Sequence, residues 1–214
     1  MTARDEILAR VRSAVADVTT PAGERRATPL VEANPPDRSE TCDLFVERVA
    51  DYRATVLRTS VEGIPAAIAD ELARLGCRSV VVPNGLDPQW TTALEASIAV
   101  LPEAEASSHA QLDAVDAVIT AATVGIAVTG TIVLDHRADQ GRRELTLVPD
   151  IHVCVVGTDQ VVHDVPEAVA RLRPEAGAAR PLTWISGPSA TSDIELNRVE
   201  GVHGPRTLVV VLVA

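Results

Sequence analysis

Aromatic side chains are scarce in this sequence of 214 residues, which contains one Phe, one Tyr and two Trp. Hydrophobic residues nevertheless make up 46% of the chain, so its core must be built mainly from Val, Ala, Leu and Ile. Charged residues account for 23%, an ordinary fraction for a globular protein. This length and composition predict one domain, or one domain with an appendage.

Cysteine is scarce as well. Cys42, Cys77 and Cys154 are far apart, and no CxxC or CxxxC spacing occurs. A zinc site or an iron–sulfur cluster held by one chain needs thiolates at such short spacings. The sequence therefore predicts isolated, buried cysteines, with no metal site and no cofactor in this chain.

Two further absences concern location and partners. No apolar run approaches the ~20 residues of a membrane-spanning helix, and the polar start of the chain lacks the apolar core of a signal peptide. The formal net charge is −11, whereas nucleic-acid backbones are bound by basic faces. We expect a cytoplasmic protein without a membrane span and without a nucleic-acid partner.

The chain begins with two segments of contrasting composition. Thr2–Val18 carries apolar residues at helical spacing, with Thr2 placed as the helix cap. Thr19–Glu40 is rich in Pro, Gly, Arg and Glu, which is typical of a linker or extended arm. The predicted organisation is an N-terminal helix with a Pro-rich arm over 1–40 and one domain over 41–214. The helix would pack on that domain or on a second subunit of an oligomer.

Short strands and helices alternate in the second part. We expect strands at 54–58, 79–82, 98–101, 117–120, 144–148, 152–156 and 207–213, and helices at 44–52, 64–75, 90–96, 111–115 and 166–172. Residues 124–134 predict a strand or hairpin around Gly130. Apolar residues on both faces of 152–156 indicate a central strand. The alternation predicts an α/β fold, with a mainly parallel sheet flanked by helices.

Small hydroxyls, acids and turn glycines concentrate between Trp184 and Pro205. An apolar strand is expected to run into a Gly-Pro turn, followed by a helix that ends at Gly201. Part of this pattern has a structural explanation, because Ser192–Glu195 fits a capping box and Gly201 fits a C-terminal cap. The remaining hydroxyls and the two Gly-Pro pairs are suited to a ligand at a strand end, where open α/β sheets bind ligands.

We expect this segment to meet the Thr-Gly-Thr loop near residue 130 at one rim of the sheet and to frame a cavity there. The residues predicted to bind a ligand are Thr129, Gly130, Thr131, Arg143, Ser186, Gly187, Ser189, Thr191, Asp193 and Gly204. Those predicted to carry chemistry are Glu195, Glu200 and His203.

Other chemistries stay open at this segment. Ser186 or Ser189 with Asp193 and His203 supplies the residue types of a hydrolase triad, but the GxSxG elbow is absent. The Ser-Gly-Pro-Ser turn suits a phosphate if a nearby arginine offsets the local acids; the candidates are Arg142, Arg143 and Arg206. Metal binding would need His152, His203, Asp150 or Glu200, whose spacings match no metal motif.

The polar segment from Asp135 to Arg143 reads as a solvated loop. A second interpretation places its arginines over a site at neighbouring strand ends.

Three ordered blocks of sequence resemble the LUD-domain family of lactate utilization protein C. They read VGIAVTGTIVLD, then QGRRELTLVPDIHVCVV, then ISGPSATSDIE followed by VEGVHGPRTL. The resemblance is densest from Thr123 onward. The earlier helix, arm and α/β units match in order and length but carry no specific motif.

The resemblance implies a fold similar to that of the sugar-phosphate isomerases and CoA transferases. It also implies a role in the oxidation of L-lactate to pyruvate, beside two iron–sulfur partner proteins that hold the redox centres. Family members often carry an acidic residue before the Thr-Gly-Thr segment, where this chain has Val128. Since a glutamate is the covalent nucleophile in related transferases, a carboxylate role at that position does not carry over to this chain.

The leading hypothesis is a non-redox subunit of an L-lactate oxidation system, which binds a small carboxylate or a partner at the sheet edge. The alternative is a free-standing enzyme that acts on a CoA ester or sugar phosphate, with Glu195 or Glu200 as acid/base. A third hypothesis is an interaction module organised by its acidic surface and N-terminal arm.

Overall fold

The computed structural model describes residues 2–17, 36–94, 98–172, 180–191, 199–200 and 204–214, without the side chains of residues 190–191 and 199–200. The chain divides into two units, Met1–Ala33 and Asn34–Ala214. The first contains helix α1 (Ala3–Ala14), which Thr2 caps as the sequence predicts, and the structure adds a reciprocal capping box with Asp5. No residue of α1 is buried within this first unit.

The larger unit begins with helix α2 (Arg38–Asp51), which Asp37 caps. It is built on a six-stranded sheet in which every neighbouring pair of strands is parallel, in the order β1-β12-β7-β4-β2-β3. The strands are β1 (Thr55–Thr59), β2 (Ser79–Val82), β3 (Ala99–Pro102), β4 (Ala117–Ala121), β7 (Ile151–Gly157) and β12 (Thr207–Val213). The predicted α/β fold and the central position of the strand at 152–156 are confirmed.

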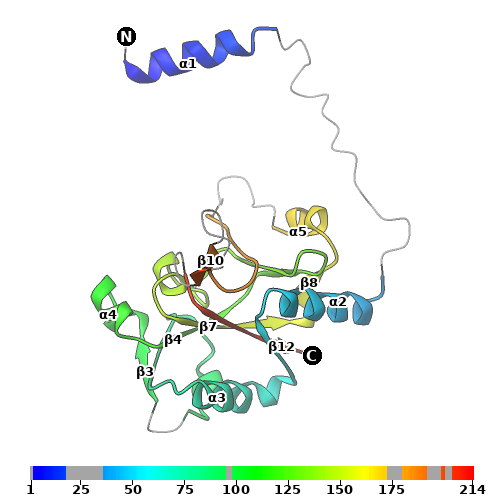
Figure 1. Ribbon diagram of the computed structural model, residues 1–214, viewed down its shortest axis with the longest axis vertical. Helices are drawn as coiled ribbons and strands as arrows, with labels where there is room; N and C mark the ends of the chain where they lie inside the picture. Colours follow the sequence, from blue (N-terminus) through cyan, green and yellow to red (C-terminus); the bar gives the residue numbers. More distant parts are fainter. Residues whose placement is uncertain (1, 18–35, 95–97, 173–179, 192–198, 201–203) are drawn as a thin grey trace. The chain divides into compact units, whose positions relative to one another are not determined.

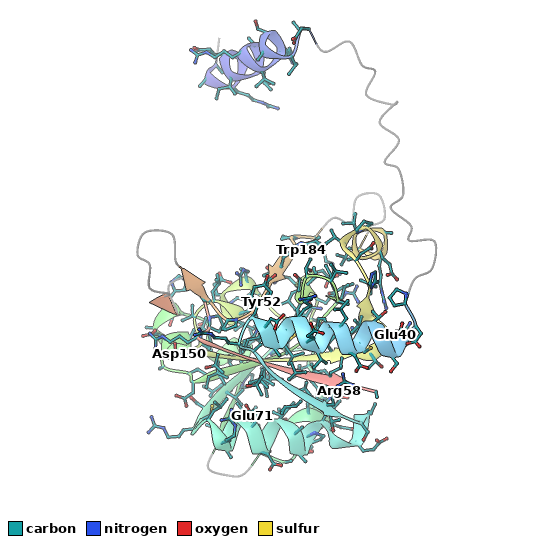
Figure 2. The ribbon with its side chains drawn as sticks, turned by 45° about the vertical axis from the view of Figure 1, so that its right-hand side comes forward. Glu40, Tyr52, Arg58, Glu71, Asp150 and Trp184 are labelled. Atoms are coloured by element: carbon teal, nitrogen blue, oxygen red, sulfur yellow. The ribbon has the colours of Figure 1, made fainter. Side chains whose placement is uncertain are left out.

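Both faces of this sheet are covered (Figure 1). Alternate residues of a strand point to opposite faces, and β12 shows the result. Leu208 and Val210 pack with Phe45 of helix α2, whereas Val209 and Val211 pack against helix α3 (Ile64–Arg74) on the other side. Figure 2 places Tyr52, at the end of α2, and Glu71, on α3, on opposite sides of the sheet.

A second sheet lies on the α2 side of the first. Its order is β8-β5-β6-β9, formed by β5 (Val124–Ile126), β6 (Thr131–Leu134), β8 (Val161–Val162) and β9 (Thr183–Ile185). β5 and β6 form the hairpin expected around Gly130, and β9 pairs antiparallel with β6. Ile132 and Leu134 share one core with Val210 and Phe45, so the two sheets are packed together. Helix α5 (Val165–Arg171) covers this second sheet through Ala168.

The remaining elements are short. They are α4 (His109–Asp113), β10 (Ala190–Thr191), β11 (Val199–Glu200) and the 3₁₀ turns η1 (Val61–Gly63), η2 (Pro88–Thr91), η3 (Glu103–Glu105), η4 (Arg143–Thr146) and η5 (Thr158–Gln160). None of the helices in the described part of the chain has the length and apolarity needed to cross a membrane.

Three predictions of secondary structure are wrong. The start of the expected helix at 90–96 is the 3₁₀ turn η2, and the expected strand at 144–148 is replaced by the 3₁₀ turn η4. The helix expected to end at Gly201 does not extend through Glu200, because β11 pairs antiparallel with β10 there. The residues between these two strands, including the predicted capping box at Ser192–Glu195, lie outside the described residues.

Candidate functional site

The structure brings the two predicted loops together. Strands β6 and β9 pair so that Ile132 lies opposite Ile185. At the end of this ladder the Oγ1 atom of Thr131 lies 2.8 Å from the Oγ atom of Ser186. The expectation that the Thr-Gly-Thr loop meets the late serine-rich segment is therefore confirmed as a matter of geometry.

Glycine is required in both loops because each packs against helix α2. Gly130 has a φ of +57°, and a Cβ atom there would lie 2.7 Å from the backbone carbon of Arg48. Gly187 has a φ of +83°, and a Cβ atom there would lie 2.5 Å from the Cβ of Tyr52. Both φ values lie in the left-handed region, which L side chains adopt only at a cost. The fit against α2 accounts for these two glycines without a ligand.

A cavity of about 280 Å³ opens beside the Ser186 hydroxyl. Five of the residues predicted to bind a ligand line it, namely Arg143, Ser186, Gly187, Ser189 and Gly204. Its other described lining residues are Thr146, His152, Trp184, Ile185, Pro188, Pro205 and Leu208. Thr129, Gly130 and Thr131 do not line it; Thr131 reaches it only through its contact with Ser186.

Arg143 provides the positive charge on the cavity wall. Its Nη1 atom donates to the Thr146 hydroxyl at 2.8 Å and to the Thr146 carbonyl at 3.3 Å. Burial lowers the pKa of Arg143, which the neighbouring Glu144 opposes, and a guanidinium stays charged at neutral pH. Among the described residues that line the cavity, no carboxylate is available to neutralise this charge.

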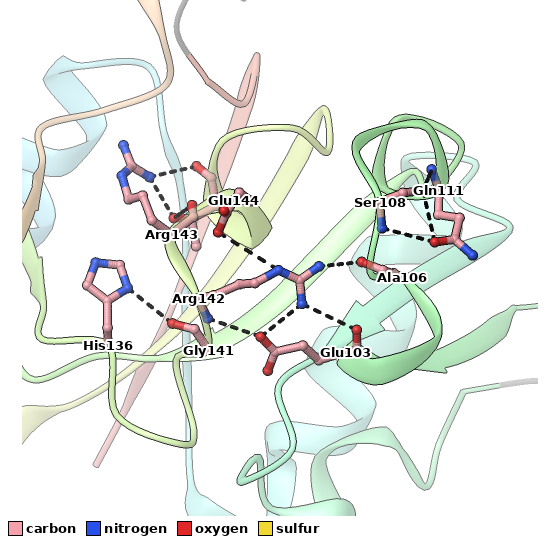
Figure 3. A network of polar contacts seen from close by, with 10 residues as sticks. Glu103, Ala106, Ser108, Gln111, His136, Gly141, Arg142, Arg143 and Glu144 are labelled. Atoms are coloured by element: carbon pink, nitrogen blue, oxygen red, sulfur yellow. Dashed lines mark hydrogen bonds and ion pairs between the residues drawn. The ribbon is translucent and has the colours of Figure 1, made fainter.

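The adjacent arginine has a different role. Arg142 points the opposite way (Figure 3), where it pairs with Glu103 at 3.1 Å and donates to the Ala106 carbonyl. Arg206 pairs with Asp150 at 3.1 Å and does not line the cavity. Of the three arginines considered for an anion, Arg143 alone faces this cavity among the described lining residues.

His152 lies on the cavity wall and is 1% exposed. Its Nε2 atom lies 2.7 Å from the Thr120 hydroxyl on strand β4. Burial lowers the pKa of His152 to about 3, and the charge of Arg143 acts in the same direction. The imidazole is therefore neutral at physiological pH, and its hydrogen bond to Thr120 fits the structural role that its place in an apolar strand suggests.

The cavity lies at the end of the parallel strands opposite to the carboxyl end, where open α/β sheets usually bind ligands. His152 and Leu208 are each the second residue of their strand, so the site is at the amino ends of β7 and β12. Connectivity explains the difference, because the segment after β9 must return to Thr207, where β12 begins.

The carboxyl end of strand β4 is occupied by the chain itself. The loop that follows β6 crosses it, since the Ala121 amide donates to the Asp139 carbonyl at 3.1 Å and the Gly85 amide donates to the Ala138 carbonyl at 2.8 Å. Gln140 is 1% exposed and donates to Thr123 at 2.8 Å. The segment expected to be a solvated loop is therefore anchored by buried polar contacts.

The other predicted site residues are outside what the structure describes. Asp193, Glu195 and His203 lie in undescribed segments, and the side chains of Thr191 and Glu200, on β10 and β11, are not described. Thr129 is described, and its hydroxyl is buried without a hydrogen-bond partner in the described structure. The predicted triad and the acid/base role of the two glutamates stay predictions.

On the sequence alone, His152 is a candidate only as a metal ligand, and Thr146 is not a candidate for any site. Thr146 belongs to a segment expected to be a strand, and its hydroxyl faces Arg143 only because a 3₁₀ turn forms there. The available signal for His152 was one polar residue at the start of an otherwise apolar strand.

Few side chains in this protein are suited to metal binding, thiol chemistry or covalent catalysis by an amine. The cysteines are free and buried, as expected. No group of three or more His, Cys, Asp or Glu side chains suited to a metal occurs in the described part of the chain. The sequence contains no lysine, so no lysine amine is present for a Schiff base or a P-loop.

Comparison with known proteins decides the family. The model of the LUD domain matches residues 45–213. The chain belongs to the LUD-domain family. The match covers both sheets and every described residue of the cavity wall.

Relatives within this family are similar over most of their length. Lactate utilization protein C of Deinococcus radiodurans is 50% identical over 179 residues, which cover 84% of this chain and 82% of that protein. Lactate utilization protein C of Geobacillus thermodenitrificans is 29% identical over 169 residues, or 70% of this chain and 68% of that protein. A crystal structure of a DUF162 family protein from D. radiodurans, 44% identical, superposes with a TM-score of 0.72 over 84% of this chain and all of that one.

Proposed function

We propose that this LUD-domain protein is a component of an L-lactate oxidation system and binds a small carboxylate in the cavity beside Arg143. Its similarity to lactate utilization protein C of D. radiodurans supports the metabolic role. The observation that carries the ligand class is the charged guanidinium on the cavity wall, which has no carboxylate partner among the described lining residues.

The geometry suits an anionic group with two oxygens. A guanidinium binds a carboxylate through two parallel N–H···O bonds. Thr146 holds Nη1 of Arg143, which orients the guanidinium and leaves its remaining donors for a ligand. The cavity volume of about 280 Å³ is just below the range of ligand pockets, which span roughly 300–1,000 Å³. It suits an acid of a few carbon atoms, whereas most of a CoA ester would lie outside.

The proposed subunit takes no part in electron transfer itself. Burial raises the pKa of Cys77 to about 11 and that of Cys154 to about 12, so both thiols stay protonated and are poor metal ligands. Iron–sulfur proteins would supply the redox centres, and this chain would hold the acid or dock beside the protein that oxidises it.

Binding of carboxylates to the purified full-length protein tests the ligand class. Calorimetric titration with L-lactate, pyruvate and propionate should detect at least one complex. Arg143→Gln should weaken it at least about tenfold, because a hydrogen bond to a charged group contributes about 1.5–3 kcal/mol.

The matched control is Arg206→Gln, which removes a nearby positive charge that does not line the cavity. It should change the affinity less than about twofold, since exposed charges are screened by solvent and salt. Absence of binding to all three acids, or equal loss in the two variants, would contradict a carboxylate site at Arg143.

The metabolic role needs a test in cells. Deletion of the gene from its source organism should impair growth on L-lactate, and the wild-type gene should restore growth. Native co-purification should recover cysteine-rich iron–sulfur proteins. Normal growth of the deletion strain, with no second copy of the gene, would contradict the lactate assignment.

A further inference from the structure

Two chains of hydrogen bonds lead away from the cavity, and each ends at a backbone carbonyl. The first runs from Ser186 Oγ to Thr131 Oγ1 at 2.8 Å and on to the carbonyl oxygen of Thr129 at 3.3 Å. A carbonyl oxygen can only accept a hydrogen bond. The single hydroxyl proton of Thr131 is therefore given to Thr129, and the hydroxyl of Ser186 donates to Thr131. The lone pairs of Ser186 Oγ are left to face the cavity.

The second chain starts at His152. Its Nε2 atom lies 2.7 Å from Thr120 Oγ1, which donates to Cys154 Sγ at 3.7 Å, and this thiol donates to the Ala121 carbonyl at 3.8 Å. Burial raises the pKa of Cys154 to about 12, so its S–H is present as a donor.

The carbonyl at the end of this series of hydrogen bonds determines which atom donates in each of them. The three contacts are hydrogen bonds at the same time only if the Ala121 carbonyl takes the thiol proton, the thiol sulfur takes the Thr120 proton and Thr120 Oγ1 accepts from His152. The imidazole is neutral and carries one N–H, which is therefore on Nε2. Its Nδ1 atom is an acceptor without a proton.

We propose that the cavity selects a 2-hydroxy acid over the corresponding 2-oxo acid, with Arg143 holding the carboxylate while one of two acceptors, His152 Nδ1 or Ser186 Oγ, takes the ligand's single hydroxyl proton. This inference rests on the proposed carboxylate site. A 2-oxo acid presents a carbonyl oxygen, which has no proton to donate to either acceptor. Thr120 and Thr131 do not line the cavity, but their hydrogen bonds to His152 and Ser186 determine that these two residues act as acceptors toward the ligand.

The preference for a 2-hydroxy acid can be measured by comparing the affinities of the protein for three acids of nearly equal size. L-lactate has the hydroxyl, pyruvate has the oxo group and propionate has neither. The wild-type protein should bind L-lactate at least about tenfold more tightly than pyruvate or propionate, since an unpaired polar group in a cavity costs about 1–3 kcal/mol. Equal affinities that Arg143→Gln abolishes together would overturn the inference and leave the carboxylate site standing. No binding of any acid would overturn both.

Thr120→Val removes the acceptor that holds the His152 N–H while keeping the side-chain shape. It should lower the lactate-to-pyruvate affinity ratio at least about fivefold and leave propionate binding within about twofold. Thr55→Val, in strand β1 away from the cavity, is the matched control and should keep the wild-type ratio. An unchanged ratio in Thr120→Val would overturn the inference.

A second measurement does not depend on any variant. The ¹⁵N chemical shifts of the labelled ring distinguish a protonated nitrogen from a bare one. His152 in the wild-type protein should show a protonated Nε2 and a bare Nδ1. The opposite tautomer would overturn the inference even if the cavity binds lactate.

Discussion

Thr131 Oγ1 lies 2.8 Å from Ser186 Oγ, although 55 positions separate the two residues in the sequence. The contact sits at the end of the antiparallel ladder between β6 and β9, whose register pairs Leu134 with Thr183. Backbone hydrogen bonds therefore set the spacing of the two hydroxyls. One wall of the cavity is built on a sheet and is fixed before a ligand arrives.

The close packing of Gly130 against α2 predicts that an alanine there lowers stability more than an alanine at a glycine with open space around it. Gly130→Ala should lower the free energy of unfolding by more than about 2 kcal/mol, because it adds a clash with the Arg48 backbone to the left-handed φ. Gly76→Ala is the control: its φ is +73°, but nothing lies within 4 Å of the added Cβ. It should cost only about 1 kcal/mol. Urea unfolding measures both, and equal losses would argue against the packing explanation.

Burial of His152 predicts a loss of stability in acid. Below pH 6.5 the unfolded chain binds a proton on this ring, whereas the folded ring, with its pKa lowered to about 3, does not. The free energy of unfolding should therefore fall between about pH 6 and pH 4 by up to about 1.4 kcal/mol per pH unit from this residue. His152→Gln should make that slope shallower by about one proton. A slope identical to that of the wild type would show that His152 is charged in the folded protein.

The raised pKa values of the buried cysteines predict slow thiol chemistry. Burial raises the pKa of Cys42 as well as those of Cys77 and Cys154. Ellman's reagent at pH 8 should react with all three thiols in urea and at least about 100-fold more slowly in buffer, since both access and thiolate are restricted. Fast labelling of one thiol in the folded protein would identify a reactive cysteine.

Two ion pairs of different burial should differ in their effect on stability. Glu103 and Arg142 have side chains that are 14% and 31% exposed, and Arg142 also donates to the Ala106 carbonyl. Glu103→Gln should lower the free energy of unfolding by about 1–3 kcal/mol, because it leaves the half-buried guanidinium of Arg142 with only the more distant carboxylate of Glu144, at 3.8 Å.

The control is the pair between Asp150 and Arg206, whose side chains are both 59% exposed. Asp150→Asn should change the free energy of unfolding by less than about 0.5 kcal/mol. Urea unfolding at low and high salt compares the two variants. Equal effects would mean that burial does not distinguish the pairs.

Strands of the main sheet could be predicted closely because both of their faces are buried. Ser79–Val82 and Thr207–Val213 are uninterrupted runs rich in Val, and each has the expected bounds. The errors fall where side chains compete with regular backbone hydrogen bonds. Thr91, the last residue of η2, and the following Thr92 donate to backbone carbonyls three residues earlier, and in η4 Thr146 donates to the carbonyl of Arg143.

The candidate site could be predicted only in part, for a physical reason. Gly-Pro turns and clustered hydroxyls can be recognised in a short stretch of sequence, so Ser186 and Gly204 can be predicted as site residues. The environment of His152 depends on Thr120, which a parallel register brings beside it from another strand. The spacing of apolar and polar residues along the chain does not show how two strands are aligned. The neutral imidazole beside Arg143 can therefore be recognised only in the folded structure.

The position of β12 between β1 and β7 has a consequence for biosynthesis. In the sheet, β1 has β12 as its only described neighbour, and the register joins Thr55 to Val209. While the ribosome is still translating the chain between β7 and β12, β1 and one side of β7 have no neighbouring strand and present open edges to solvent. We expect the domain to fold after β12 has emerged, and nascent chains to depend on chaperones until then.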